Sequence, residues 1–152
     1  MKKSLLLSRP LLVNEVREGL WMGGAPPVGS TVSRHFDALA LCAIEYQVPD
    51  AFPGVDTLAV PLNDDGTPMT RQEARQAVAA AGRVISWISS GKKVLVTCYA
   101  GRNRSGLITA IALCKGPNPV RVGTAIGMIR EARGPAALNN EHFVRFLKEY
   151  CG

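Results

Sequence analysis

The sequence predicts a three-layer α/β sandwich in which a central, mostly parallel sheet is flanked by helices. Apolar runs of strand length occupy the first two-thirds of the chain, and patterns with helical periodicity fill the last third. The apolar run at 94–96 passes through a short loop directly into a second apolar helical pattern. Ligands bind at the carboxyl ends of strands in such sheets, so this strand, loop and helix form the expected functional unit.

Four segments before residue 70 carry strand or turn signals. Residues 16–22 read as a turn followed by a short strand, and residues 33–37 as a short helical turn. The compact apolar run 38–43 predicts a buried strand, with a helical turn as the alternative, and 55–62 alternates weakly as a further strand. Together these segments supply the neighbours of the central strand.

The helices are signalled by apolar spacing and by their end residues. The clearest spans 70–89, where Thr70 and Glu73 have the spacing of a capping box. Three more follow the central strand, and glycine and proline residues separate the first two of them. Their expected ranges are 105–113, 120–130 and 140–150.

Composition limits the class of protein. The 152 residues suit one domain with a hydrophobic core, which we assign to 1–152. Hydrophobic residues make up 47% and charged residues 20%, as in ordinary globular proteins. A net charge of +6 favours anionic partners, but charge alone does not separate a phosphoprotein, an inositol lipid and a nucleic acid.

The cysteines and the start of the chain indicate a cytoplasmic protein. The four cysteines have no paired metal-ligand spacing and suit a reducing compartment. They are Cys42, Cys98, Cys114 and Cys151. Residues 1–7 resemble a signal peptide faintly, but Arg9 and Pro10 interrupt the apolar run, so we interpret them as a surface arm before the first strand. No segment is long enough to span a membrane.

The strand, loop and helix around residue 98 carry the chemistry. Cys98 ends the strand, five residues follow, and Arg104, Ser105 and Gly106 open the helix. Helix N-terminal amides and a nearby cation stabilise a thiolate, and the same amides bind phosphate oxygens. The planar fork of Arg104 grips two such oxygens, while the hydroxyl of Ser105 is placed to donate to the sulfur. Gly101 lets the loop turn closely around an anion.

The backbone of the whole loop is expected to surround the phosphate. Its residues are Tyr99, Ala100, Gly101, Arg102, Asn103 and Arg104. Tyr99 either borders the substrate or packs beside it, and Arg102 is an additional cation that favours a more highly charged ligand. The alternative interpretation is that Cys98 is a small buried apolar residue. It leaves the ordered combination of strand, glycine, Arg-Ser-Gly and helix unexplained.

This run resembles the signature loop of the cysteine-dependent protein tyrosine phosphatase superfamily, in its small dual-specificity branch. The family pattern is His-Cys, five residues, Arg, Ser or Thr, and Gly, and this chain departs from it at Thr97, where the family has histidine. The resemblance implies hydrolysis of phosphate monoesters through a phosphocysteine intermediate, with no metal or cofactor. It also implies a phosphorylated protein as substrate and a monomeric enzyme.

A general acid and base is expected on a second loop, because the leaving group needs a proton and the attacking water needs a base. Residues 60–66 resemble the family's general-acid loop, where an aspartate follows an apolar-Pro-apolar-x pattern. Asp64 matches that position. Asp65 is the second candidate and Asp56, in the preceding strand, the third. Asn-Asp-Asp-Gly is also an ordinary turn sequence.

The end of the chain resembles the segment before the family's last helix, which places Asn140 three residues before Phe143. Asn140 therefore either borders the pocket or caps the helix, and the cap is the favoured interpretation. Residues 45–47, after the strand at 38–43, are further candidates for the pocket rim. The sequence leaves open whether Cys42 or Cys114 lies close enough to Cys98 to protect it as a disulfide.

Several other functions remain open. Inositol phospholipid is one alternative substrate, and RNA 5′-phosphate is another because the run from Asn103 to Gly106 is similar to the loop of RNA 5′-phosphatases in the superfamily. Nucleic acid is less favoured because the chain has no RNA-binding motif and no aromatic platform. Thr97 motivates a phosphate-binding module without turnover. A sulfurtransferase also uses a cysteine loop, but Arg-Ser-Gly fits phosphate better.

Overall fold

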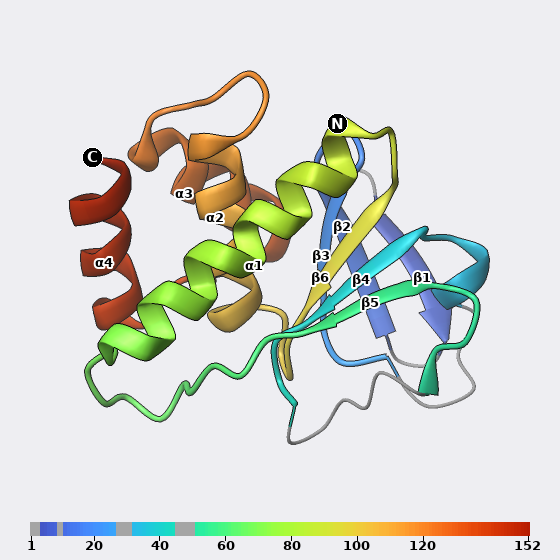
Figure 1. Cartoon of the computed structure of the whole chain (residues 1–152), viewed down its shortest axis with the longest axis horizontal. Coiled ribbons are helices and arrows are strands. Elements are labelled where there is room, and N and C mark those ends of the chain that lie inside the picture. The colour runs from blue at the N-terminus through green and yellow to red at the C-terminus, as the bar shows by residue number, and fades with distance from the viewer. Residues whose placement is uncertain (1–3, 9–10, 27–31, 45–50) are drawn as a thin grey trace.

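The fold is built on a six-stranded sheet with the strand order β1-β2-β3-β6-β4-β5. The structure, a computed structural model, describes residues 4–8, 11–26, 32–44 and 51–152 (Figure 1). Its elements in chain order are β1 (Ser4–Ser8), β2 (Leu11–Arg17), β3 (Leu20–Gly23), the 3₁₀ helix η1 (Val32–Arg34), β4 (Ala38–Leu41), β5 (Asp56–Ala59), α1 (Arg71–Ser89), β6 (Val94–Thr97), α2 (Arg104–Lys115), α3 (Val122–Arg133) and α4 (Glu141–Cys151).

Strand β6 lies in the middle of the sheet and is parallel to both of its neighbours. Val96 is in register with Met22 of β3 on one side and with Ala40 of β4 on the other. Strand β5 extends the parallel part beyond β4, while β1 and β2 add an antiparallel hairpin beside β3. The carboxyl end of β6, where Cys98 follows, is therefore enclosed by β3 and β4.

The two faces of the sheet are covered differently. Val94 and Val96 point into the core beneath the helices, whereas Leu95 belongs to a second cluster on the opposite face. The four α-helices lie together on one side of the sheet, as Figure 1 shows. On the opposite face, in the described residues, the cover consists of η1 and the turn that contains Phe52.

The predicted sandwich is confirmed, and two of its strands differ in detail. Residues 4–8 of the expected surface arm form the edge strand β1, while residues 1–3 lie outside the described part of the chain. Strand β5 ends at Ala59 rather than at Leu62: the N–H of Val60 still donates to Leu41 O at 2.9 Å, but the N–H of Leu62 turns back to Val60 O at 3.0 Å and does not continue the pairing with β4. The shorter strand releases Leu62 and the residues after it as a loop that crosses toward the helices.

All four predicted helices form, and they begin and end within three residues of the expected limits. Thr70 caps α1: its Oγ1 accepts from the N–H of Glu73 at 3.0 Å, and Glu73 Oε1 accepts from the N–H of Thr70 at 3.2 Å. Helix α2 lies at the centre of the helical layer, in contact with α1, α3 and α4. The position of α2 is consequently fixed by three other helices.

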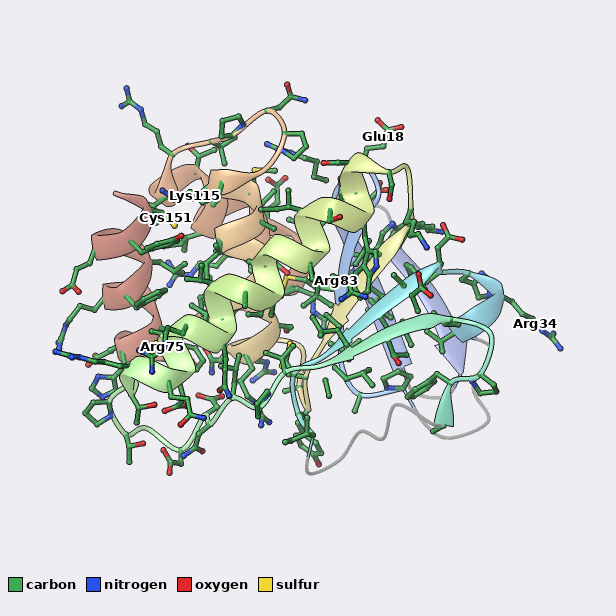
Figure 2. All side chains as sticks on the ribbon, in the orientation of Figure 1. Glu18, Arg34, Arg75, Arg83, Lys115 and Cys151 are labelled. Carbon is green, nitrogen blue, oxygen red and sulfur yellow. The ribbon has the colours of Figure 1, made fainter. Side chains whose placement is uncertain are left out.

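The far end of α2 packs against the end of α4. Figure 2 labels Lys115 and Cys151 at this contact, where Cys114 also interacts with Cys151. Burial, followed by the neighbouring Cys114, raises the pKa of Cys151 to about 12, and burial raises the pKa of Cys114 as well. In the part of the chain that the structure describes, no helix combines the length and apolarity required to cross a membrane.

Replacing Thr70 with alanine removes the side-chain half of the α1 cap. We expect Thr70→Ala to lower the free energy of unfolding by about 1 kcal/mol, measured by urea denaturation. Ser89→Ala, at the exposed other end of α1, is the control and should stay within about 0.5 kcal/mol of the parent. Equal changes in the free energy of unfolding for the two substitutions would show that the capping box at Thr70 and Glu73 does not stabilise the helix.

Candidate active site

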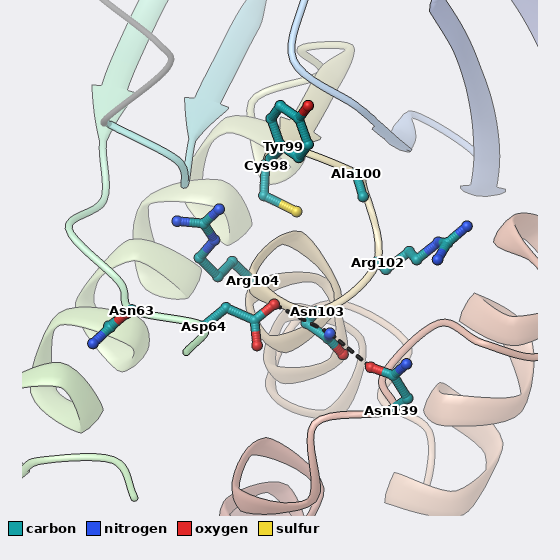
Figure 3. Close-up of a pocket in the computed structure, with 9 residues that line it drawn as sticks. All are labelled: Asn63, Asp64, Cys98, Tyr99, Ala100, Arg102, Asn103, Arg104 and Asn139. Carbon is teal, nitrogen blue, oxygen red and sulfur yellow. Dashed lines mark hydrogen bonds between the residues drawn. The ribbon is translucent and has the colours of Figure 1, made fainter. Parts of the chain in front are cut away.

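Cys98 is the first residue after β6 and projects its sulfur into a cavity of about 390 Å³. The side chain is only 3% exposed, and its Sγ lies 3.2 Å from Ser105 Oγ in the first turn of α2. Figure 3 shows the sulfur facing the space between the general-acid loop and the loop that leads to α2. The cavity is lined by Asn63, Asp64, Cys98, Tyr99, Ala100, Arg102, Asn103, Arg104 and Asn139.

The loop turns at Gly101, which has a φ of +69°. A Cβ at this position would lie 2.5 Å from the carbonyl carbon of Gly23, at the end of β3. The N–H of Ala25 donates to the carbonyl of Tyr99 at 3.2 Å, so the first half of the loop is held against the same segment. Glycine is needed at 101 for both its backbone conformation and its closeness to β3.

Arg133, the last residue of α3, supports the loop from outside. Its Nε donates to Gly101 O at 3.0 Å and its Nη2 to Ala100 O at 3.2 Å. Its Nη1 donates to Leu12 O at 3.0 Å and to Asn14 Oδ1 at 2.6 Å, which ties the loop to β2. Burial lowers the pKa of Arg133, while the charge of Cys98 acts in the opposite direction. Sequence reasoning missed this support of the loop, because no motif marks Arg133 apart from its cationic side chain.

Arg104 opens α2 and is nearly buried, with 8% of its surface exposed. Its Nη1 lies 3.4 Å from the carbonyl oxygen of Leu62, which connects it to the general-acid loop. Two residues later, a Cβ on Gly106 would lie 2.9 Å from Cγ of Leu138. The absence of a side chain at position 106 therefore makes room for Leu138.

The three candidate acids occupy different places. Asp64 lines the cavity, as its position between Asn63 and Asn103 in Figure 3 shows. Asp65 accepts from Asn63 Nδ2 at 2.9 Å and from the N–H of Thr67 at 3.0 Å, and the hydrogen bonds from Thr67 hold its pKa below the usual range. Asp56 lies in β5 and forms an ion pair with Lys92, in which Oδ2 and Nζ are 2.6 Å apart. The hydrogen bond and the charge of Lys92 lower the pKa of Asp56.

Asparagine side chains join the two loops to the start of α4. Asn103 Nδ2 donates to Asp64 Oδ2 at 3.2 Å and to Asn139 Oδ1 at 2.8 Å (Figure 3). Asn140 caps α4, as predicted, and its Nδ2 also donates to Asp64 Oδ1 at 2.7 Å. The sequence proposed Asn140 for either the cap or the rim; the structure shows the cap and a contact with Asp64, and Asn139 rather than Asn140 lines the cavity.

Thr97, which replaces the family histidine, is completely buried. Its Oγ1 lies 3.4 Å from the carbonyl oxygen of Ala40, so the hydroxyl links β6 to β4. Cys42 follows β4 in register beside Cys98, with its N–H donating to Thr97 O at 2.8 Å. Burial, reinforced by Cys98, raises the pKa of Cys42 well above its usual range. Of the two cysteines considered as neighbours of Cys98, Cys42 is therefore the adjacent one.

Residues 45–47, which the sequence offered as candidates for the pocket rim, lie outside the described residues. Among the residues that are described, no group of three or more His, Cys, Asp or Glu side chains could hold a metal ion.

The family model described as dual specificity phosphatase, catalytic domain, matches residues 32–151. The chain therefore belongs to the dual-specificity phosphatase family, which confirms the resemblance of the loop at Cys98 and makes the protein a cysteine-dependent protein phosphatase. No curated protein sequence matches the chain.

Solved structures of similar proteins agree with this family. Human DUSP28 is 25% identical, with a TM-score of 0.78 and 95% of each chain covered. A mouse putative dual specificity phosphatase, complexed with zinc tungstate, is 25% identical at a TM-score of 0.74, covering 98% of this chain and 91% of its own. The active form of Tk-PTP, 24% identical at a TM-score of 0.76, covers 89% of this chain and 92% of its own, and shares the fold.

Arg133→Lys keeps a positive charge but loses the fork that binds two loop carbonyls. We expect inhibition by inorganic phosphate to weaken about tenfold, because at least one hydrogen bond to a charged group is lost. The measurement is the inhibition constant of phosphate with p-nitrophenyl phosphate as substrate. Arg121→Lys, at the exposed start of α3, is the control. Unchanged inhibition in folded Arg133→Lys would show that the loop keeps its shape without this support.

Proposed function

We propose that the chain hydrolyses phosphate monoesters on protein side chains through a phosphocysteine formed at Cys98. The observation that carries the proposal is the meeting of Cys98, Arg104 and Asp64 around one cavity. The thiol, the guanidinium and the carboxyl group come from β6, α2 and the loop after β5, which only the fold brings together. The thiol can act as the nucleophile, the guanidinium can bind two phosphate oxygens, and the carboxyl group can donate a proton.

In the first step, the thiolate of Cys98 attacks phosphorus, and the bond between phosphorus and the leaving oxygen breaks. Asp64 gives its proton to that oxygen. Arg104 and the N–H groups at the start of α2 bind the equatorial oxygens, because first-turn N–H groups have no acceptor within the helix. In the second step, water attacks phosphorus, Asp64 takes the water's proton, and the bond from sulfur to phosphorus breaks. Ser105, 3.2 Å from the sulfur, stabilises the departing thiolate.

The other features of the proposal concern where the enzyme acts and on what. Four free cysteines support a cytoplasmic location, since a catalytic thiol needs a reducing compartment. A monomer is the form that the family resemblance implies. The cavity wall is formed largely by amide and guanidinium groups, and this polar wall supports phosphoserine and phosphothreonine as substrates alongside phosphotyrosine.

Cys98→Ser replaces the nucleophile with a much weaker one of similar size. We expect turnover of p-nitrophenyl phosphate, measured with EDTA present, to fall by several orders of magnitude while inorganic phosphate still binds. Persisting turnover in Cys98→Ser would refute the phosphocysteine mechanism.

The same protein allows a second readout that does not depend on turnover. Raised pKa values keep Cys42, Cys114 and Cys151 as unreactive thiols at neutral pH. We therefore expect iodoacetamide to add one group to the parent protein and none to Cys98→Ser, measured by intact mass. A parent protein that is not alkylated and does not turn over substrate would instead favour the phosphate-binding module.

Arg102 favours a second candidate substrate, the inositol phosphates. Its side chain is exposed and lies on the opposite side of the loop from Arg104, as Figure 3 shows. A second phosphate on the substrate would meet this guanidinium. We expect Arg102→Ala to raise KM for a soluble inositol bisphosphate about tenfold and to change KM for p-nitrophenyl phosphate little. Equal effects on both substrates would exclude a second anion contact.

A further inference from the structure

We propose that Asn103 and Asn140 form a clamp that fixes the orientation in which the carboxyl group of Asp64 transfers its proton to the leaving group. The two amides are positioning residues, since they act through Asp64. The inference rests on the proposed function, in which Asp64 transfers the proton. It assigns a chemical role to two side chains that the sequence placed only in the phosphate loop and at a helix cap.

The orientation of the Asn140 amide is fixed by the helix that it caps. Its Oδ1 accepts from the N–H groups of His142 at 3.0 Å and Phe143 at 3.2 Å. Because the oxygen is committed to these two donors, the Nδ2 group must face the other way. It donates to Asp64 Oδ1 at 2.7 Å. The start of α4 therefore presents an amide donor, not an acceptor, to the carboxyl group.

Asn103 is oriented by the same argument from the opposite side. Its Oδ1 accepts from the backbone N–H of Asn140 at 3.0 Å, so its Nδ2 faces Asp64 Oδ2 at 3.2 Å. Asn139 Oδ1 accepts from the same Nδ2 at 2.8 Å and further fixes the side chain. The two oxygens of Asp64 are consequently bound by two different amides, each of which is locked by its own backbone partner.

One amide donor on each oxygen restricts the rotation of the Asp64 carboxyl group. The other titratable or charged side chains around Asp64 come from three elements: Cys98 and Arg102 from the phosphate loop, Arg104 from α2, and Glu141 and His142 from the start of α4. His142 Nε2 lies 3.1 Å from the carbonyl oxygen of Gly66 and so contacts the acid loop beyond Asp64. The clamp is thus the direct contact of the carboxyl group, and the other charges surround it.

The clamp matters most for a substrate whose leaving group depends on the proton that Asp64 supplies. Phenoxide is a poor leaving group and needs that proton, whereas p-nitrophenoxide is stable enough to leave without it. A carboxyl group that loses its orientation therefore slows the hydrolysis of phenyl phosphate more than that of p-nitrophenyl phosphate.

The experiment removes the amide donors while keeping the helix cap. Serine and aspartate both cap helices well, so Asn140→Ser removes the donor, and Asn140→Asp also places a second carboxylate beside Asp64. The substrates are phenyl phosphate and p-nitrophenyl phosphate, and kcat/KM is measured for both. We expect kcat/KM for phenyl phosphate to fall about tenfold relative to that for p-nitrophenyl phosphate in Asn140→Ser, and further in Asn140→Asp. Asn103→Ser, which frees the other oxygen, should change this ratio in the same direction.

Two comparisons make the outcome decisive. His142→Ala removes another contact between α4 and the acid loop without touching Asp64, so the ratio of the two kcat/KM values should stay at the parent value. Asp64→Asn should give the largest fall in that ratio, and an unchanged ratio in Asp64→Asn would overturn the proposed acid itself. If Asp64→Asn lowers the ratio but the folded Asn140 and Asn103 variants leave it unchanged, the acid stands and the clamp is overturned. An equal loss of kcat/KM on both substrates would show a purely structural role and would also overturn the clamp.

Discussion

The outward direction of the carbonyl groups of Ala100 and Gly101 is the constraint on which the site depends. A loop that offers its N–H groups to an anion must turn its carbonyl groups away, and carbonyl groups turned into the protein need donors. Gly101 supplies the left-handed backbone, and Arg133 supplies the donors. The loop at Cys98 therefore works only because α3 ends beside it and because β2 holds the other end of the same guanidinium.

The segment between α3 and α4 completes the site at a conformational cost. Leu138 has a φ of +57°, a left-handed conformation that costs a residue with a side chain about 1–2 kcal/mol. Its N–H donates to Arg102 O at 3.2 Å, and Arg130 donates to the carbonyl groups of Ala137 and Leu138. These bonds and the complete burial of the leucine against Gly106 offset the strain. The strained turn is what brings Asn139 to the cavity and Asn140 to Asp64.

The sequence predicted the parts of this protein that local patterns encode. Helix α1 is predicted by Thr70, Glu73 and the apolar spacing, and the loop at Cys98 is predicted by residue types at fixed intervals. The edge hairpin was missed because β2 carries Asn14, a polar residue that is buried only through its bond to Arg133. Contacts between side chains of elements that are far apart in the chain leave no such pattern in the sequence. The roles of Arg133 and Leu138, and the contact of Asn140 with Asp64, depend on turns whose geometry no short motif specifies.

The general-acid loop shows why those distant partners matter. Residues after Leu62 are mostly exposed and bury little apolar surface, so the loop has few means of fixing its own position. The carboxylate of Glu73, at the start of α1, accepts from the N–H of Asn63 at 3.1 Å and holds one side. Asn140, at the start of α4, holds the other through Asp64 itself. Asp64 is thus placed by the starts of two helices, while Cys98 is placed by the end of a buried strand. In the proposed mechanism, the rigid core fixes where the phosphate binds, and polar contacts at its edge decide how the proton is delivered.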